Sequence, residues 1–304
     1  MPKKYLIVVA GPTAVGKTAL AIDLAKHFDT DILSADSRQF YRGMDIGTAK
    51  PTVTELAAAK HYFIDNQDFT ALYNVGDYER EAIKTLDSIF ETKDIAIMVG
   101  GSGLYIKAVL EGLDSFPDIS EATKQIVKTD FENHGLIYLQ NKLQTLDPQY
   151  FTQVDIHNSS RVMRALEVCI ESGLPYSSFL KKGETKRNFE PIYVLLDLNR
   201  AELYQRINDR VALMLELGLE QEAKNLHPYK DLNALQTVGY KEFFEYFDGH
   251  TTFDTAVELI KQHSRNYAKR QLTWFRKYGD WTTFSPTQTA AVIDFINKKI
   301  EEKS

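Results

Sequence analysis

Residues 11–18 read Gly11-Pro12-Thr13-Ala14-Val15-Gly16-Lys17-Thr18, which is a complete G-x-x-x-x-G-K-[ST] pattern. An apolar run, residues 5–10, precedes the pattern, and a segment of helical character, residues 19–28, follows it. A strand that turns through such a loop into a helix is the setting in which this pattern binds phosphate. Backbone N–H groups and the helix N-terminus face the anion, the lysine adds positive charge, and the threonine hydroxyl can hold Mg²⁺. The stretch therefore predicts a site for a di- or triphosphate, with Thr18 as the metal ligand.

The pattern of apolar runs predicts the fold class. Three apolar, β-branched runs alternate with helix-length segments: the runs are residues 6–10, 31–35 and 95–99, and the segments include 19–28 and 75–90. This alternation predicts a parallel sheet with crossover helices. A fourth run, 191–198, arrives late, and the residues before it read only as helices, at 121–134, 137–146 and 160–172. We therefore expect an α/β protein whose P-loop NTPase-like parallel sheet core carries an inserted all-helical domain.

These elements divide the chain into three segments. Residues 1–116 form the first part of the α/β core, residues 117–190 the helical insertion, and residues 191–304 the completion of the core with basic C-terminal helices. The basic residues Lys181, Lys182, Lys186 and Arg187 lie at both ends of the return path from the insertion and predict an exposed, mobile connection. After residue 201 we expect helices only, ending in a basic helix at residues 259–278.

Composition narrows the class of protein. The 304 residues are 43% hydrophobic with a net charge of −6, and no apolar run approaches the roughly 18 residues that span a membrane. The N-terminus enters its first strand too soon for a signal peptide, so we expect a cytoplasmic protein. The single cysteine, Cys169, excludes a disulfide framework and a cysteine-based zinc site. The segment 259–279 has no acidic residue and six basic ones, which favours a polyanionic partner at one surface.

The second and third predicted strands both end in polar residues. The second is followed by Asp36-Ser37-Arg38-Gln39 and the third by Gly100-Gly101-Ser102-Gly103. Because ligands of open α/β sheets bind at the carboxyl ends of the strands, we expect these residues in one crevice. The third strand lacks the terminal acidic residue with which NTPases hold Mg²⁺, which disfavours ordinary ATP or GTP hydrolysis.

The residue types alone do not assign a single role to each residue of this crevice. Asp36 could cap a helix together with Ser37, bind a metal or act as a general base. The amide of Gln39 offers a donor and an acceptor that suit the edge of a nucleobase. The glycines around Ser102 could form an anion-binding nest or simply a flexible turn.

Arginines and lysines at helical spacing predict contacts with anions. Arg161 and Arg164 share one face of a helix in the insertion, and Lys261, Arg265 and Lys269 lie close to one line of the C-terminal helix. Arg206 and Arg210 are also one turn apart, near the return to the core. A diphosphate in the loop needs such an arginine because Lys17 and one Mg²⁺ leave part of its charge uncompensated.

Taken together, the motifs resemble those of the tRNA dimethylallyltransferases of bacterial type. The matching segments run through nearly the whole chain: residues 11–18, 36–41, 43–51, 61–65, 75–78, 100–105, 161–168, 238–242 and 267–276. Asp-Ser-x-Gln at residues 36–39 and Lys-Arg-Gln-x-Thr-Trp-Phe at 269–275 are the specific ones. Ser102 stands where many members carry threonine, and the zinc finger of eukaryotic members is absent.

The resemblance implies an enzyme that moves a dimethylallyl group from dimethylallyl diphosphate to N6 of an adenosine beside the anticodon. It implies Asp36 as the base, with Lys17, Arg210 and Ser102 acting on the diphosphate, Gly11 to Thr18 binding it, and Mg²⁺ as cofactor. The partner is a tRNA anticodon stem-loop and the enzyme a monomer. The implied tRNA contacts are Asp36, Ser37, Arg38, Gln39, Ser102, Lys124, Ser160, Arg161, Val162, Met163, Arg164, Lys261, Arg265 and Lys269.

Three rival functions share part of this pattern. A small-molecule P-loop kinase has the same loop and the same strand-end aspartate. An isopentenyltransferase that acts on free adenine nucleotides has similar chemistry, but it does not account for the insertion or the basic C-terminal helix. An RNA-binding nucleotide switch would use the loop without transferring a group.

Overall fold

The computed structural model describes residues 3–180 and 185–303, so Lys181 and Lys182 of the predicted connection lie outside the described residues. The chain divides into two compact units. The larger unit combines residues 1–111 with residues 186–304, and the smaller unit consists of residues 112–185. The insertion predicted from the sequence, 117–190, is shifted slightly along the chain relative to this division.

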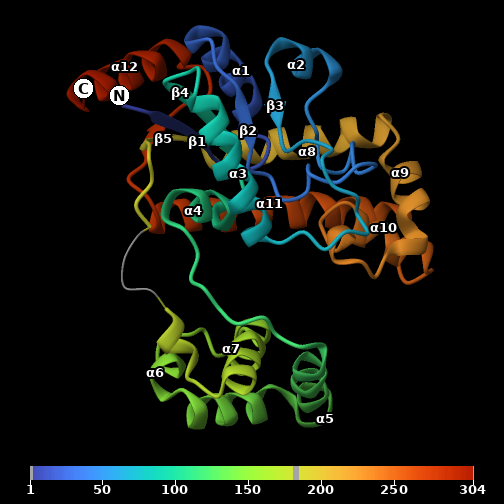
Figure 1. The fold of residues 1–304 in the computed structure, drawn as a ribbon. Helices are drawn as coiled ribbons and strands as arrows, with labels where there is room; N and C mark the ends of the chain where they lie inside the picture. Colours follow the sequence, from blue (N-terminus) through green and yellow to red (C-terminus); the bar gives the residue numbers. More distant parts are fainter. Residues whose placement is uncertain (1–2, 181–184, 304) are drawn as a thin grey trace. The chain divides into compact units, whose positions relative to one another are not determined.

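A six-stranded parallel sheet forms the centre of the larger unit (Figure 1). In spatial order its strands are β3 (His61–Tyr62), β2 (Ile32–Ser34), β4 (Ile95–Gly100), β1 (Tyr5–Ala10), β5 (Glu190–Leu196) and β6 (Thr282–Phe284). The predicted parallel sheet is thus confirmed, and β1, β2, β4 and β5 match the four predicted runs. The prediction of helices only after residue 201 is wrong at β6. The two unpredicted strands lie at the sheet edges and are too short to show a pattern of their own.

Both faces of the sheet are covered because β1 is apolar on both sides. Ile7 and Val9 face α1 (Lys17–Phe28), α8 (Arg200–Glu216) and α12 (Thr289–Lys303). Leu6 and Val8 face α3 (Val75–Phe90) and α4 (Gly103–Glu111) on the other side. Strands buried on both faces read as continuous apolar runs, which is why these were visible in the sequence.

A third cluster lies beyond the carboxyl ends of the strands. It is built by α9 (Leu219–Leu226), α10 (Tyr240–Phe247) and α11 (Phe253–Lys277), with short 3₁₀ turns at η2 (His227–Tyr229) and η3 (Asn233–Leu235). The basic helix predicted at 259–278 is α11, which starts earlier because Thr252 caps its N-terminus by accepting a hydrogen bond from the N–H of Thr255. Short α2 (Val53–Ala58) precedes β3.

In the smaller unit, the regular secondary structure of the described residues consists of helices. Its elements are α5 (Glu121–Leu146), α6 (Pro148–Phe151), α7 (Ser159–Ser172) and η1 (Tyr176–Phe179). Gly135, with φ of 75°, breaks α5 where the sequence predicts two helices. The unit has its own core, which includes Val127, Leu143 and Leu166. Across the described residues of the chain, no helix combines the length and apolar character needed to cross a membrane.

Candidate active site

The phosphate-binding loop connects β1 to α1 in the larger unit. Gly11 and Gly16 have φ of 155° and 107°, and the intervening Ala14 also has positive φ, 65°. A Cβ on Gly11 would lie 2.6 Å from the carbonyl oxygen of Leu196 on β5, so only glycine fits there. With these turns the chain passes from a buried strand to a helix N-terminus at Lys17, the geometry that presents backbone N–H groups to an anion.

Two half-buried cations flank this loop. The ammonium of Lys17 donates to the carbonyl oxygen of Pro12 at 2.8 Å, and Arg210 donates to Thr13 Oγ1 at 3.4 Å. Burial lowers the pKa of Lys17 to about 8, with the nearby Asp36 opposing this shift and Arg210 adding to it. Burial also lowers the pKa of Arg210. Neither forms an ion pair with any described residue, so this part of the protein is prepared for an anionic ligand.

Arg210, and not Arg206, reaches the phosphate loop. The two arginines lie one turn apart on α8, but Arg206 donates to Glu202 Oε1 at 2.9 Å on the same helix. Arg210 is thus the one of the two that contacts the phosphate loop, because its face of α8 packs against Thr13.

Asp36 lies in a turn directly after β2. Its Oδ1 accepts a hydrogen bond from the backbone N–H of Arg38 at 3.1 Å. Residues 37–40 form a turn and not a helix, so the helix-capping role considered for Asp36 and Ser37 is wrong. The carboxylate forms no ion pair within the described part of the chain. It nevertheless acts electrostatically on Lys17 and Arg210, because its negative charge opposes the lowering of both pKa values.

Ser102, between β4 and α4, is tied to the end of β2. Its Oγ accepts from the N–H of Ser37 at 3.0 Å and donates to Ser37 Oγ at 3.2 Å. The neighbouring glycines do not form an anion nest, since none of Gly100, Gly101 and Gly103 has positive φ. They permit close packing instead: a Cβ on Gly100 would lie 2.3 Å from the carbonyl oxygen of Ala35. The two strand ends are therefore held against each other.

The sequence did not single out Gln271 or Tyr267 as site residues, yet both lie there. Gln271 on α11 accepts from the N–H of Thr13 at 2.9 Å and donates to the carbonyl oxygen of Gly101 at 3.0 Å, so it bridges the loops after β1 and β4. Tyr267 lines the larger cavity of the site, and burial, reinforced by Asp36, raises its pKa to about 12. A glutamine on the otherwise apolar inner face of α11 was the available signal for Gln271.

Arg38 and Gln39 are already engaged with the protein. Arg38 donates to the carbonyl oxygens of Asn233 and Ala234 at 3.0 and 3.1 Å. The amide nitrogen of Gln39 donates to the carbonyl oxygens of Thr48 and Ala49 at 3.2 and 3.1 Å. In this structure Gln39 therefore holds the loop that follows it.

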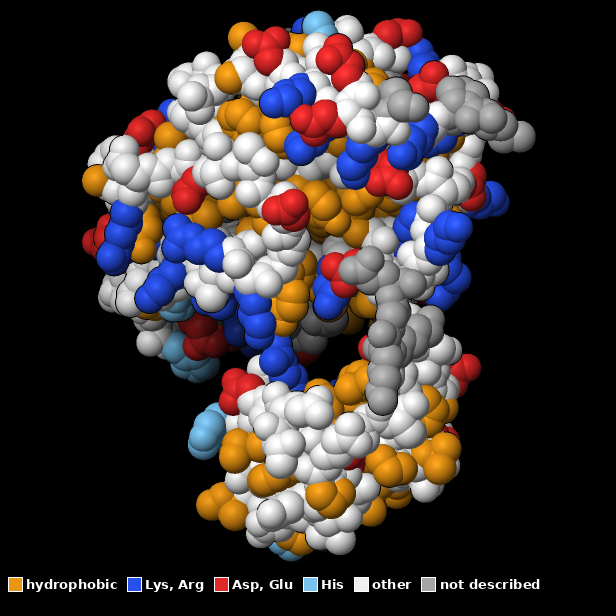
Figure 2. Space-filling view, turned by 90° about the vertical axis from the view of Figure 1, so that its left-hand side faces the viewer, with side chains coloured by type: hydrophobic (Ala, Val, Ile, Leu, Met, Phe, Trp, Pro, Cys, Tyr) orange, Lys and Arg blue, Asp and Glu red, His pale blue; other side chains and the backbone are white. Residues whose placement is uncertain are grey.

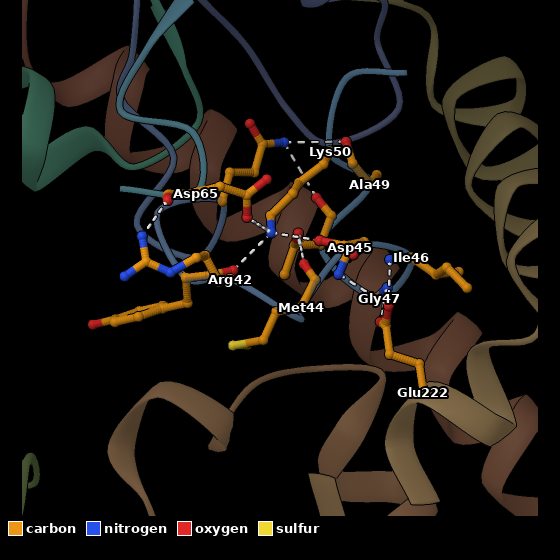
Figure 3. A network of polar contacts seen from close by, with 12 residues as sticks. Arg42, Met44, Asp45, Ile46, Gly47, Ala49, Lys50, Asp65 and Glu222 are labelled. Carbon is orange, nitrogen blue, oxygen red and sulfur yellow. Dashed lines mark hydrogen bonds and ion pairs between the residues drawn. The ribbon is translucent and has the colours of Figure 1, made fainter. Parts of the chain in front are cut away.

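That loop, residues 42–50, is fixed by charged side chains at both of its ends (Figure 3). Glu222 of α9 accepts from the N–H groups of Asp45, Ile46 and Gly47 at 3.0, 2.9 and 2.9 Å. Lys50 donates to Asp45 Oδ1 at 2.6 Å, and it also contacts Asp65. The Thr48 and Ala49 backbone therefore forms a rigid wall beside Gln39.

Two cavities meet at Asp36. The larger, of about 750 Å³, extends from Thr13, Asp36 and Arg210 along α8, α10 and α11. The smaller, of about 30 Å³, is lined by Lys17, Thr18 and Asp36 among others. Among the residues that the structure describes, Asp36 is the one that lines both cavities. The carboxylate thus stands between a space at the phosphate loop and a space large enough for a nucleobase.

The predicted RNA-binding residues on α11 differ in their surroundings. Lys261 is ion-paired with Glu258 at 2.8 Å, and Arg265 donates to Asn208 Oδ1 at 2.7 Å. Lys269 is exposed and forms no ion pair with any residue that the structure describes. Of the three, Lys269 is therefore the one available to a phosphate without breaking an existing contact.

The predicted RNA-binding residues of the smaller unit differ in exposure and in ion pairing. Lys124 is paired with Glu121 at 2.5 Å, and Arg164 lies 3.5 Å from Glu167. Ser160 and Arg161 are exposed, and Met163 is half-buried. Val162 is fully buried in the unit's core, so the prediction that it contacts tRNA is wrong for its side chain. Figure 2 shows hydrophobic and uncharged side chains over most of the visible face of this unit, whose exposed apolar residues include Ile126, Ile137 and Leu174.

Comparison with known proteins assigns the family. The model of the IPP transferase family matches residues 39–278. The chain is 50% identical to the tRNA dimethylallyltransferase of Christiangramia forsetii, over 97% of this chain and 98% of that one. It is 48% identical to that of Flavobacterium johnsoniae, over 98% and 99% of the two chains.

Solved structures agree with this assignment. The tRNA isopentenylpyrophosphate transferase of Bacillus halodurans matches with a TM-score of 0.74 at 36% identity, over 99% of this chain and 98% of that one. A eukaryotic dimethylallyltransferase acting on tRNA matches with a TM-score of 0.80 at 26% identity, over 97% and 80% of the two chains. With its P-loop NTPase-like fold and its phosphate loop beside Asp36, the chain belongs to the IPP transferase family, as a tRNA dimethylallyltransferase of bacterial type.

Proposed function

We propose that this enzyme transfers a dimethylallyl group from dimethylallyl diphosphate to N6 of an adenosine next to the anticodon of tRNA, and releases diphosphate. The observation that carries the proposal is the position of Asp36, which alone lines both the small cavity at the phosphate loop and the large cavity along α11. A group transfer needs its two substrates to meet at one point. We propose that the two substrates meet at Asp36.

On the donor side, negative charge grows on the diphosphate as its allylic C–O bond breaks. The N–H groups of residues 14–18 and the half-buried cations Lys17 and Arg210 stabilise that charge. Ser102 lies near the bridging oxygen in this arrangement. Neither cation has an ion-pair partner in the described part of the chain, and a bound diphosphate would balance their charge.

The residues at the loop also fit Mg²⁺. The Thr18 hydroxyl and the Asp36 carboxylate both line the small cavity, and Mg²⁺ takes one or two protein oxygens together with phosphate oxygens. No cluster of three or more acidic, His or Cys residues suited to a metal occurs in the described ranges, which agrees with an ion held mainly by the substrate. When bound, Mg²⁺ neutralises part of the diphosphate charge.

On the acceptor side, N6 of adenine is a weak nucleophile because its lone pair is delocalised into the ring. We propose that Asp36 removes the N6 proton as the new C–N bond forms. The bond to the diphosphate oxygen breaks in the same reaction, the electron pair leaves with the diphosphate, and the proton stays on the carboxylate.

The adenosine reaches Asp36 by leaving its stack and entering the 750 Å³ cavity. An anticodon loop supplies such a base more readily than a duplex does, because its bases are unpaired. We propose that Ser37 and Arg38, which line this cavity, lie along the path of the base, and that Gln39 contributes by holding the Thr48 and Ala49 backbone beside it. Lys261, Arg265 and Lys269 of α11 are proposed to contact the RNA backbone. Lys124, Ser160, Arg161, Met163 and Arg164 of the smaller unit are proposed as further RNA contacts.

The test is mass analysis of nucleosides from unmodified tRNA incubated with the protein, Mg²⁺ and dimethylallyl diphosphate. We expect a dimethylallyl group on one adenosine and no consumption of ATP or GTP. Modification of free adenine nucleotides in place of tRNA would overturn the tRNA assignment. ATP turnover that depends on a hydroxyl acceptor would indicate a kinase, and nucleotide-dependent RNA binding without transfer would indicate a switch.

We further propose that the enzyme acts as a monomer in the cytoplasm. The loop, Asp36, Arg210 and the wall of the large cavity all come from one chain, so the proposed chemistry requires no second copy. Light scattering of the purified protein with and without tRNA tests the monomeric state.

A further inference from the structure

His61 on β3 carries a ring nitrogen with an unmet requirement for a hydrogen bond. Its Nδ1 lies 2.8 Å from the carbonyl oxygen of Ala59. Because a carbonyl oxygen can only accept, this contact assigns the proton to Nδ1 and leaves Nε2 of the neutral ring with a lone pair. Nε2 is buried and has no hydrogen-bond partner in the described part of the protein.

Such an atom is rare in this protein. Among the described residues only one other buried side-chain polar atom lacks a partner, Nε of Arg187. The Arg187 guanidinium is already bound through Nη2 to Glu79 at 2.6 Å and to the carbonyl oxygen of Ala108 at 2.8 Å. The His61 acceptor has no such second contact. A buried acceptor without a partner is unfavourable, so an atom outside the protein is expected to supply the donor.

His61 lines the small cavity at the phosphate loop, together with Lys17, Thr18 and Asp36. The parallel pairing of β3 with β2, in which His61 is the register partner of Ile32, brings it there. A cavity of about 30 Å³ has room for water but not for a prenyl group or a nucleobase. The partner of Nε2 is therefore a small species at the diphosphate end of the site.

On a neutral ring Nε2 needs a hydrogen-bond donor, and the oxygens of an ionised diphosphate can only accept. Mg²⁺ itself prefers oxygen ligands to imidazole nitrogen and keeps several of its waters when it binds to a protein. Waters in its hydration shell are strong donors. We propose that Nε2 of His61 accepts a hydrogen bond from a water in the hydration shell of the Mg²⁺ that enters with the diphosphate. His61 is then a positioning residue for the ion, and this inference rests on the Mg²⁺-diphosphate site of the proposed function.

Two substitutions at His61 test the roles of Nδ1 and Nε2 separately. In His61→Asn the amide can still donate to the Ala59 carbonyl in place of Nδ1, but nothing replaces Nε2. In His61→Gln the longer side chain can place an amide oxygen near the position of Nε2. The ligand is a saturated alkyl diphosphate, which keeps the charged diphosphate but lacks the allylic group that lets the C–O bond break. Calorimetry measures its affinity in the presence of Mg²⁺ and in the presence of EDTA.

We expect His61→Asn to bind the Mg²⁺ complex about 10- to 100-fold more weakly than the wild type, the usual effect of removing a partner of a metal ligand. Its affinity in EDTA should be unchanged, and His61→Gln should recover most of the loss. An equal loss with Mg²⁺ and with EDTA, or no loss at all, would overturn the role of His61. Wild-type protein whose affinity does not respond to Mg²⁺ would instead overturn the metal site of the proposed function. Thermal unfolding of both variants identifies any general loss of structure.

Discussion

The cations at the phosphate loop and the cations on the helix surfaces differ in what surrounds them. Lys17 and Arg210 are half-buried near Asp36 and lack ion-pair partners in the described structure, and their removal from water lowers the pKa of both. Lys124 and Lys261 are paired with acidic residues three positions away on their own helices. A surface pair contributes little free energy and can be exchanged for a phosphate contact, whereas a buried cation without a counterion favours a bound anion. We therefore expect large effects at the loop and small ones at the surface.

The largest effect is expected where the two cavities meet. Asp36→Asn should slow transfer by about 10²- to 10⁴-fold, the range for loss of a positioned general base. The asparagine oxygen can keep the hydrogen bond from the Arg38 N–H, so the turn is preserved while the basic group is lost. Single-turnover rates with saturating tRNA and donor measure the effect.

A metal-binding role for Asp36 gives a different result. If high Mg²⁺ restores the rate of the Asp36→Asn variant, the carboxylate holds the ion and its assignment as the base is wrong. Loss of tRNA affinity in the same variant would instead indicate that Asp36 acts mainly in RNA binding.

The next largest effect is expected at Arg210, for which Arg206 on the same helix is a matched control. Arg210→Ala should slow transfer by about 10²- to 10³-fold, as for removal of one group that stabilises developing negative charge. Arg206→Ala should stay near wild type because Arg206 contacts Glu202 and not the loop. Transfer rates and tRNA affinities of both variants are to be compared. Equal rates in the two variants would contradict the assignment of Arg210.

The pKa of Lys17 predicts a pH dependence of donor binding. In the ligand-free protein this pKa is lowered to about 8, and a bound diphosphate raises it because the anion favours the ammonium form. Binding therefore takes up a proton above pH 8, and affinity for a saturated alkyl diphosphate should fall about tenfold per pH unit there. Calorimetry in buffers of different ionisation enthalpy detects the proton uptake. Lys17→Met should bind more weakly and without this dependence; an unchanged pH profile in that variant would place the titration elsewhere.

The smallest effect is expected on the surface of α11. Lys269→Ala should reduce the slope of log K for tRNA against log salt by about 0.7 to 0.9, the value of one phosphate contact. Lys261→Ala should change the slope less, because Lys261 already has a partner in Glu258. An unchanged slope for Lys269→Ala would remove this residue from the interface. Arg161→Ala, which changes an exposed arginine of the smaller unit, extends the same measurement.

Features that depend on one continuous stretch of residues could be predicted from the sequence. The glycines, lysine and threonine of the loop stand in register after an apolar strand, so the loop and its position in the fold followed directly. The two edge strands of the sheet could not be predicted, because β3 and β6 have only two and three residues and show no alternation of apolar and polar side chains. His61 was overlooked as a site residue for the same reason.

Contacts between distant segments were the least predictable. Gln271 bonds to Gly101 across 170 positions, and only the packed fold shows that α11 crosses both loops. Arg206 and Arg210 could not be separated without knowing which face of α8 packs on Thr13. Val162 is a different case, because Val162, Ala165, Leu166 and Cys169 follow the spacing of a buried helix face. That periodicity was available in the sequence and would have excluded its side chain from an RNA contact.

The division of the larger unit between two separated segments has a consequence for synthesis. The central strand β1 pairs on one side with β4, residues 95–100, and on the other with β5, residues 190–196. A ribosome delivers β5 only after the whole smaller unit, which at ordinary elongation rates takes on the order of several seconds. During that time one edge of an apolar strand lacks its neighbour, a state prone to association with other chains. The smaller unit has a core made only of its own residues, so it can fold while β1 waits for β5.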